Sequence, residues 1–196
     1  MFEKLIQDIK RQAAVADHDF EKITAALKIR IIKKKKNLLN QGDAADKMYY
    51  VHTGLFRYYI IDEFGNEKTL DLVAQHNWFG DAKAFLSGAK AGINIEALED
   101  AQVFELSKDD LERFFDEIPF FERAVRKIIE HYFVKALDRI EKISNSSYTA
   151  QQRYEALLKS HPKLGNRVPS MYLASYLGIT PETLSRLRAQ QFKQSA

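Results

Sequence analysis

Six polar side chains near the C-terminus have the types and the close spacing needed to contact a nucleic acid. Arginine can form two hydrogen bonds with guanine O6 and N7, glutamate can accept one from cytosine N4, and serine and threonine can reach phosphates or a thymine methyl group. These side chains are Thr180, Glu182, Thr183, Ser185, Arg186 and Arg188. Their types predict a surface that reads bases and contacts phosphates.

Two helices joined by a turn are predicted to hold this surface. Pro169 fits the first turn of one helix, and Gly178 fits the turn at its C-terminal end. Thr180 can cap a second helix that has Pro181 and Glu182 in its first turn. The side chains expected to face the domain interior are Leu173, Ala174, Leu177, Ile179, Leu184 and Leu187. The pattern predicts a helix-turn-helix, with a plain packing hairpin as the alternative.

The charge distribution is compatible with DNA binding. Residues 146–196 contain seven lysine and arginine residues and two acidic residues, a net charge of +5, whereas residues 1–145 contain 23 basic and 25 acidic residues, a net charge of −2. Basic side chains release condensed counterions when they contact phosphates. Because an ordinary solvated surface could carry the same charge, the prediction depends on the helical pattern.

The region from Ile29 to Phe104 is rich in short β-type runs. Stretches such as IRII and AQVFEL alternate with turn signals such as QGDAAD and EFGNE. Several short strands at close spacing predict a sandwich or barrel. A short amphipathic helix is expected before it, from Asp17 to Leu27, with Asp17 or Asp19 as its cap.

A long amphipathic helix is predicted after the β-rich region. Ser107 should cap a short helix, and Pro119 should begin a longer one that runs to Ser144. At 1.5 Å per residue it would be about 39 Å long, too long to be covered by one small β domain. We expect a partner helix to cover its apolar stripe, although an ordinary core helix is the alternative. The stripe comprises Val125, Ile128, Ile129, Tyr132, Phe133, Ala136, Leu137, Ile140 and Ile143.

A polar stretch from Ser144 to Gln152 has the composition of an interdomain hinge. We therefore expect a β-roll sensor domain at residues 1–117, a dimerisation helix at residues 118–145, and a helix-turn-helix domain at residues 146–196.

Two motifs resemble a known family. The run E-T-L-S-R at residues 182–186 resembles the E-T-[VI]-[GS]-R run in the recognition helix of Crp/Fnr regulators, and its serine resembles the fumarate and nitrate reduction branch. The passage from Gln41 to Asp81, which ends in F-G-D, is similar to a cyclic-nucleotide-binding domain. Because the chain ends soon after the recognition helix, it resembles Bacteroidetes members of the family.

This resemblance implies an α+β fold with an N-terminal double-stranded β-helix of the jelly-roll type, a dimerisation helix and a winged-helix-like helix-turn-helix domain. It implies a homodimer that binds a palindromic operator in double-stranded DNA, with Glu182, Ser185 and Arg186 as base readers. Pro181 stands where the cyclic-AMP receptor branch has arginine, so one contact of that branch should be missing. RNA polymerase and an unidentified small-molecule effector are further expected partners.

The cassette that holds cyclic nucleotides in this family is altered here. The family's cassette opens with G-E and closes with R-[ST]-A, but an ungapped count from Gly80 puts Asp81 at the glutamate position and Ala91 and Gly92 at the two closing positions. A cyclic phosphate would lose a charged hydrogen bond worth about 1.5–3 kcal/mol, and Lys90 is the nearest cation. We predict no control by cyclic AMP. The candidate effector residues are Phe79, Gly80, Asp81, Ala82, Lys90, Ala91 and Gly92.

Composition excludes several other classes. The chain has no cysteine, which rules out iron–sulfur clusters, disulfides and thiolate metal sites, and its five histidines lack metal-ligand spacing. We therefore expect no metal, no cofactor and no enzyme activity. A cupin-like metalloenzyme is one alternative. No apolar run approaches the length of a membrane span, so a cytoplasmic location is expected. The other alternative is a β-roll sensor that does not read DNA.

Overall fold

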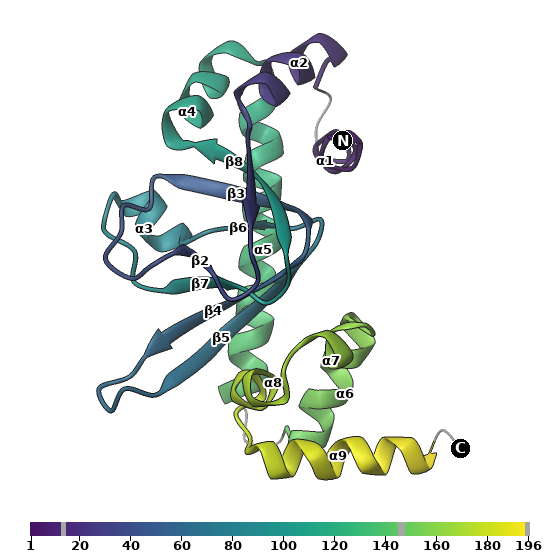
Figure 1. Ribbon diagram of the computed structural model, residues 1–196. Helices are drawn as coiled ribbons and strands as arrows, with labels where there is room; N and C mark the ends of the chain where they lie inside the picture. The colour runs from purple at the N-terminus through teal and green to yellow at the C-terminus, as the bar shows by residue number, and fades with distance from the viewer. Residues whose placement is uncertain (13–14, 145–147, 195–196) are drawn as a thin grey trace. The chain divides into compact units, whose positions relative to one another are not determined.

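The computed structural model describes residues 1–12, 15–144 and 148–194 (Figure 1). The chain divides into two compact units, one formed by Met1–Tyr58 and Leu72–Val134 and the other by Tyr59–Asp71 and Lys135–Ala196. One long helix and one β-hairpin contribute residues to both units.

Within the described residues, the strands form two four-stranded sheets. One sheet has the strand order β1-β8-β3-β6 and the other has the order β2-β7-β4-β5. The strands are β1 (Lys28–Ile32), β2 (Asn37–Leu39), β3 (Lys47–Thr53), β4 (Leu55–Ile61), β5 (Glu67–Ala74), β6 (Trp78–Phe79), β7 (Asn94–Ala97) and β8 (Ala101–Ser107). The predicted jelly-roll is confirmed, although β2 and β6 were not predicted.

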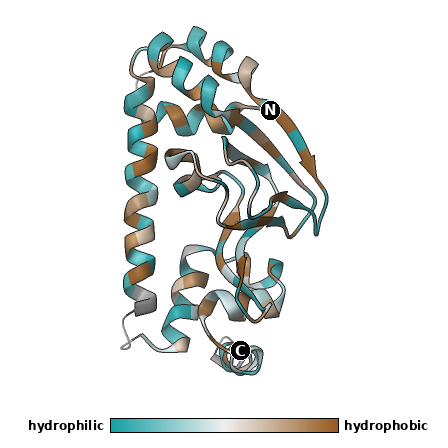
Figure 2. Cartoon of the chain, turned by 90° about the vertical axis from the view of Figure 1, so that its left-hand side faces the viewer, coloured by the Kyte–Doolittle hydropathy of each residue, from teal (hydrophilic) through white to brown (hydrophobic). Residues whose placement is uncertain are grey.

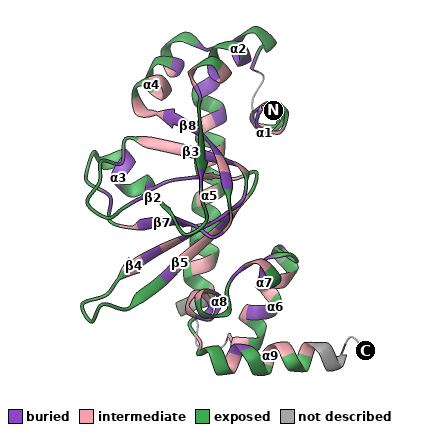
Figure 3. Ribbon diagram, viewed as in Figure 1, coloured by how far each residue is buried: buried purple, intermediate pink, exposed green. Residues whose placement is uncertain are grey.

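Alternating side chains of β3 and β8 pack in two different hydrophobic cores. Successive residues on a strand point to opposite faces, so Val51 and Val103 fill the interior of the jelly-roll, whereas Tyr50 and Phe104 lie in a second cluster with the N-terminal helices. All four side chains are fully or almost fully buried. Figure 3 shows β7 and β8 as largely buried. This double burial explains why the strands contain continuous apolar runs.

Gly54 makes the sharp turn between β3 and β4. Its φ of +107° is unfavourable for other residues, and a Cβ atom there would lie 2.5 Å from the Cβ of Ala101. The turn therefore requires glycine for two independent reasons.

The helices of the first unit include two that the sequence did not predict, α1 and α3. The bounds are α1 (Glu3–Lys10), α2 (Asp17–Ala26), α3 (Ala82–Ser87), α4 (Lys108–Glu117) and α5 (Phe121–Ser144). The predicted cap of α4 is confirmed, because the side chain of Ser107 accepts a hydrogen bond from the backbone N–H of Asp110 at 3.1 Å.

Two predicted helix starts were wrong. The N-cap residue of α2 is Ala16, which has no side-chain acceptor, and Asp17 and Asp19 lie inside the first turn. Helix α5 begins at Phe121 instead of Pro119 because Phe120 adopts a left-handed conformation, with φ of +64°, which interrupts the helical path.

The second unit contains a small helical domain around buried Tyr154 and Leu164. Its helices are α6 (Ala150–Ser160), α7 (Leu164–Arg167), α8 (Ser170–Leu177) and α9 (Pro181–Gln194). A capping box between Thr149 and Gln152 starts α6. The predicted hinge was therefore too long, because its last residues belong to a helix, while residues 145–147 lie outside the described part of the chain.

The β4–β5 hairpin is held to α8 and to the last turns of α5 by polar contacts within the second unit. The backbone N–H of Thr69 donates to Ser175 Oγ at 2.9 Å, and Arg139 forms an ion pair with Asp71 at 2.9 Å. Hairpin residues 59–71 thus pack with the helices that carry the candidate site.

Candidate nucleic-acid interface

Helices α8 and α9 form the predicted helix-turn-helix. Leu173 and Leu184, one from each helix, are completely buried, and Ala174 and Leu177 are also buried. Ile179 and Leu187 are half-buried. The predicted inner face is therefore confirmed, and it fixes which side of α9 points outward.

The turn between the helices has the predicted backbone geometry. Gly178 is left-handed, with φ of +66°, and the N–H of Ile179 donates to the carbonyl of Ala174 at 3.0 Å. The Oγ1 atom of Thr180 accepts from the N–H of Thr183 at 3.2 Å, which caps the start of α9 as predicted.

The N-terminal half of α9 presents a linked polar surface. Thr180, Glu182, Ser185 and Arg186 are exposed, and Thr183 is half-buried. Hydrogen bonds of 3.2 Å connect Thr183 Oγ1 to Thr180 Oγ1 and to the guanidinium of Arg186. These bonds limit the rotamers of Arg186 without burying its charge.

Glu182 is favoured in its ionised form. A backbone N–H, the hydroxyl of Thr180 and the positive charge of Arg186 lower the pKa of its carboxyl below the ordinary value. An ionised carboxylate is an acceptor only, so Glu182 suits the amino group of cytosine and disfavours acceptor atoms.

Arg188 differs from the other five predicted DNA contacts. Its guanidinium donates to the carbonyl of Gly165 at 2.6 Å and to Ser170 Oγ at 2.7 Å, so it ties α9 to α7 and to the start of α8. Helix α7 was not predicted, because the run LGNR has no helical signal of its own. Arg188 therefore has an internal role that its spacing did not predict.

The predicted dimer stripe on α5 is largely exposed in the single chain. Ile129, Phe133 and Ile140 are 50%, 63% and 59% exposed. Leu137 and Ala136 are exposed as well, whereas the side chain of Ile143 is outside the described residues. Figure 2 shows hydrophobic and hydrophilic bands alternating along this helix.

Other members of the stripe contact the protomer's own β unit. Val125 packs against the buried cluster that includes Phe104, and the hydroxyl of Tyr132 accepts a hydrogen bond from the N–H of Trp78 at 2.8 Å. Ile128 is half-buried. One side of α5 is therefore used within the chain, and a different side leaves apolar groups uncovered.

Two of the predicted effector residues, Asp81 and Gly92, are hydrogen-bonded to each other across the cassette. One carboxylate oxygen of Asp81 accepts from the N–H of Ala84 at 3.1 Å, and the other accepts from the N–H of Gly92 at 2.8 Å. Asp81 thus closes the two ends of the cassette on each other. The carbonyl of Ala91 also accepts from the N–H of Gly42 at 2.8 Å.

The remaining effector candidates divide between core and surface. Phe79 and Ala91 are buried, and Phe79 contacts the ring of Phe56 at a centroid distance of 4.7 Å. Ala82 and Lys90 are exposed. The hydroxyl of Tyr58 both accepts from the N–H of Gly80 at 2.8 Å and donates to its carbonyl at 3.1 Å.

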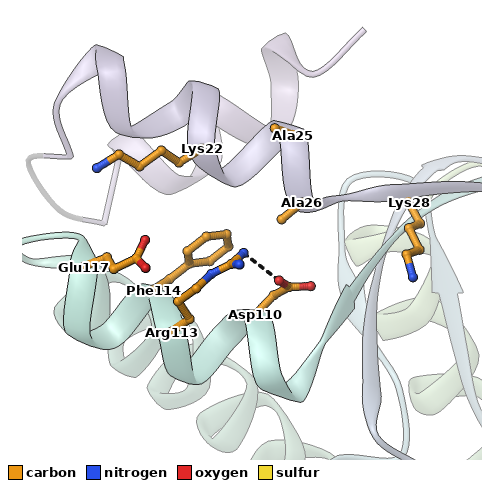
Figure 4. A pocket seen from close by; sticks show the side chains of 8 residues that line it. All are labelled: Lys22, Ala25, Ala26, Lys28, Asp110, Arg113, Phe114 and Glu117. Carbon is orange, nitrogen blue, oxygen red and sulfur yellow. Dashed lines mark hydrogen bonds and ion pairs between the residues drawn. The ribbon is translucent and has the colours of Figure 1, made fainter.

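A surface hollow in the first unit lies elsewhere, between α2 and α4 (Figure 4). Its lining mixes cations such as Lys22 and Lys28 with Asp110 and Glu117, and Arg113 is paired with Asp110 at 2.6 Å. None of the predicted effector residues lines this hollow.

The described residues contain neither a candidate metal site nor a helix that could span a membrane. No group of three or more histidine, aspartate or glutamate side chains could hold a metal ion in the described ranges. Among the helices that the structure describes, none is both long and apolar enough to cross a membrane.

Comparison with known sequences shows which proteins the chain resembles. Residues 29–118 match the family described as Cyclic nucleotide-binding domain. The chain is 25% identical over 171 residues to the Anaerobic regulatory protein of Aggregatibacter actinomycetemcomitans. This alignment covers 80% of this chain and 63% of that protein. It is 23% identical over 167 residues to the Fumarate and nitrate reduction regulatory protein of Yersinia pestis, with 80% and 65% covered. The chain thus spans less than two thirds of these relatives.

The fold is also similar to that of a solved structure. The structure of FixK2 from Bradyrhizobium japonicum is similar with a TM-score of 0.75 and 20% sequence identity, over 86% of each chain. The chain is therefore similar over residues 29–118 to cyclic nucleotide-binding domains, and the relatives that it matches over a longer stretch are named as regulatory proteins. The Bacteroidetes-type subdivision stays a prediction.

Proposed function

We propose that this protein is a DNA-binding transcription regulator that reads a palindromic operator as a homodimer joined along α5. The observation that carries the proposal is the exposed polar face of α9, which is oriented by the buried Leu184 on the same helix. The relatives named as regulators support it. In a two-fold dimer, two copies of α9 would enter successive major grooves about 34 Å apart.

Within each half-site, the three base readers would have distinct roles. Arg186 would bind guanine O6 and N7, Glu182 would accept from cytosine N4, and Ser185 would contact a neighbouring base or phosphate. Thr180 and Thr183 would hold the start of α9 and the side chain of Arg186 in place.

The proposal includes no control by cyclic AMP and no metal or other cofactor. Both oxygens of Asp81 already accept backbone hydrogen bonds, which disfavours their use for a ribose hydroxyl. Any other effector of the β-roll would act by favouring one spacing of the two recognition helices. A cytoplasmic location and contact with RNA polymerase at promoters belong to the same proposal.

The first experiment is selection of bound fragments from random DNA with the wild-type protein, with Arg186→Ala and with Lys83→Ala. Lys83 is an exposed cation in the other unit, so its removal controls for the loss of one charge. We expect a palindromic motif for the wild type and for Lys83→Ala. Arg186→Ala should lose preference at one base pair per half-site and about 1–3 kcal/mol of affinity.

Two outcomes of this selection would contradict the proposal. An unchanged motif with Arg186→Ala would refute the role of that residue. The absence of any motif for a folded wild-type dimer would favour a sensor that does not read DNA. In a separate titration, nanomolar to low-micromolar binding of cyclic AMP would refute the proposed independence from that nucleotide.

A further inference from the structure

Arg153 joins the start of the helical domain to the turn of the helix-turn-helix. Its Nε atom donates to the carbonyl of Leu177 at 3.1 Å, and its Nη1 atom donates to the carbonyl of Tyr148 at 3.0 Å. Tyr148 precedes α6, whereas Leu177 is the last residue of α8 and is followed directly by Gly178. One guanidinium group therefore contacts two backbone segments that are 29 residues apart in the sequence.

The chemistry of a helix end explains why an arginine is suited to this place. The last carbonyls of a helix have no donor within the helix, and a cation there also interacts favourably with the helix dipole. The N–H groups of Gly178 and Ile179 donate to the carbonyls of Ser175 and Ala174, so they leave the carbonyl of Leu177 for Arg153. The planar guanidinium can satisfy two acceptors in fixed directions, whereas lysine offers a single point charge.

We propose that Arg153 is a positioning residue that sets the orientation of α9 for DNA reading without contacting DNA itself. This inference rests on the proposed function. A displacement of the backbone at Tyr148 would pass through the guanidinium to Leu177 and hence to the turn that precedes α9. Arg188 makes comparable contacts at the other end of α8, through Gly165 and Ser170.

This role can be separated from phosphate binding by the dependence of affinity on salt. An arginine that contacts a phosphate contributes about 0.9 to the slope of log affinity against log salt concentration, and its loss weakens specific and non-specific binding alike. A positioning residue leaves that slope and the non-specific affinity unchanged, and its loss lowers only the affinity for the specific site.

The test measures both affinities over a range of salt concentrations for the full-length wild type, Arg153→Met, Arg153→Lys and Lys159→Ala. We expect Arg153→Met to lose about tenfold or more in specific affinity, because a charged hydrogen bond is removed, with no change of slope. Arg153→Lys should recover part of this loss, since one amine can reach the carbonyl of Leu177 but cannot span both acceptors. Lys159, an exposed cation on the same helix, is the matched control for charge.

Amide hydrogen exchange of the DNA-free protein gives a second readout. In Arg153→Met, the N–H groups of Gly178 and Ile179 should exchange faster, while amides in the core of the β unit stay unchanged. If the wild type reads no DNA sequence, the proposed function fails, but this exchange experiment still decides whether Arg153 holds the turn.

Two results would overturn the inference. Unchanged exchange at the turn together with a lower salt slope would identify Arg153 as a phosphate contact. Faster exchange throughout the helical domain, with an unchanged ratio of specific to non-specific affinity, would show that Arg153 only stabilises the fold.

Discussion

Replacing Phe133 with alanine should weaken the proposed dimer, because this side chain is 63% exposed on α5 in the single chain. Full burial of a phenylalanine contributes about 1.5–3 kcal/mol, so covering the exposed part would contribute about 1–2 kcal/mol. A two-fold interface contains the residue twice, which gives about 2–4 kcal/mol per dimer. The dissociation constant should therefore rise about 30- to 700-fold.

Sedimentation equilibrium over a concentration series would measure this change. Asp138→Ala is the matched control, since Asp138 is an exposed polar residue on the same helix, and its dissociation constant should stay within a few-fold of the wild type. Circular dichroism of each variant would check that the helix content is retained. A wild type that is monomeric at micromolar concentration, or an equal dissociation constant for Phe133→Ala, would refute the assignment of α5 as the dimer helix.

Three further predictions concern stability. Leu184→Ala should destabilise the helical domain by about 2–5 kcal/mol, because the side chain is completely buried, and calorimetry should show a lowered transition; an unchanged transition would contradict the described packing. Gly65 has a φ of +81° and open space around it, so Gly65→Ala should lower the free energy of unfolding in urea by about 1–2 kcal/mol. Gly54→Ala should lower it by about 1–3 kcal/mol more, because a Cβ atom there would contact Ala101. Equal losses for the two variants would disprove this close approach. Burial and the nearby charge of Lys135 lower the pKa of His161, so the unfolded chain binds more protons than the folded one and stability should be lost as the pH falls below about 6.5. The variant His161→Gln should remove that part of the pH dependence of the melting temperature, and an identical pH profile would argue against a lowered pKa of His161 in the folded chain.

The helix-turn-helix could be predicted from sequence because its signals are local. A left-handed glycine at Gly178, a capping hydroxyl at Thr180 and the apolar spacing that buries Leu184 each act within a few residues. These local features all favour the same backbone arrangement. Such agreement makes the structure of a short segment predictable from its sequence. The strands of the β-rich region could be predicted for a similar reason, because its short apolar runs are separated by strong turn signals.

The short elements could not be predicted in the same way. Helix α1 has eight residues, a length that is marginal for an isolated helix, and it is stabilised by burial of Leu5 and Ile9 in the cluster that includes Phe104. Strand β6 has two residues and is defined by its pairing with Tyr49 and Tyr50 on β3. Such contacts join distant parts of the sequence, so no local pattern indicates them.

Side-chain directions are the feature that sequence spacing determines least. Spacing placed Tyr132 in the dimer stripe and Arg188 on the DNA-reading surface. In the structure, the hydroxyl of Tyr132 bonds to the backbone of Trp78, and Arg188 bonds to Gly165. A long polar side chain can turn toward any acceptor within its reach, and the position of that acceptor depends on the tertiary fold. Arg153 was overlooked for the same reason.

The hydrogen bonds of Asp81 bear on the proposed independence from cyclic AMP. Asp81 is one methylene shorter than glutamate, and its two oxygens lie within hydrogen-bond distance of the N–H groups of Ala84 and Gly92. A ligand hydroxyl at this carboxylate would have to compete with bonds worth about 1.5–3 kcal/mol each. Without an arginine at the closing positions to hold a phosphate, no comparable gain would offset that loss. The two hydrogen bonds of Asp81 within the cassette therefore support the proposed independence from cyclic AMP.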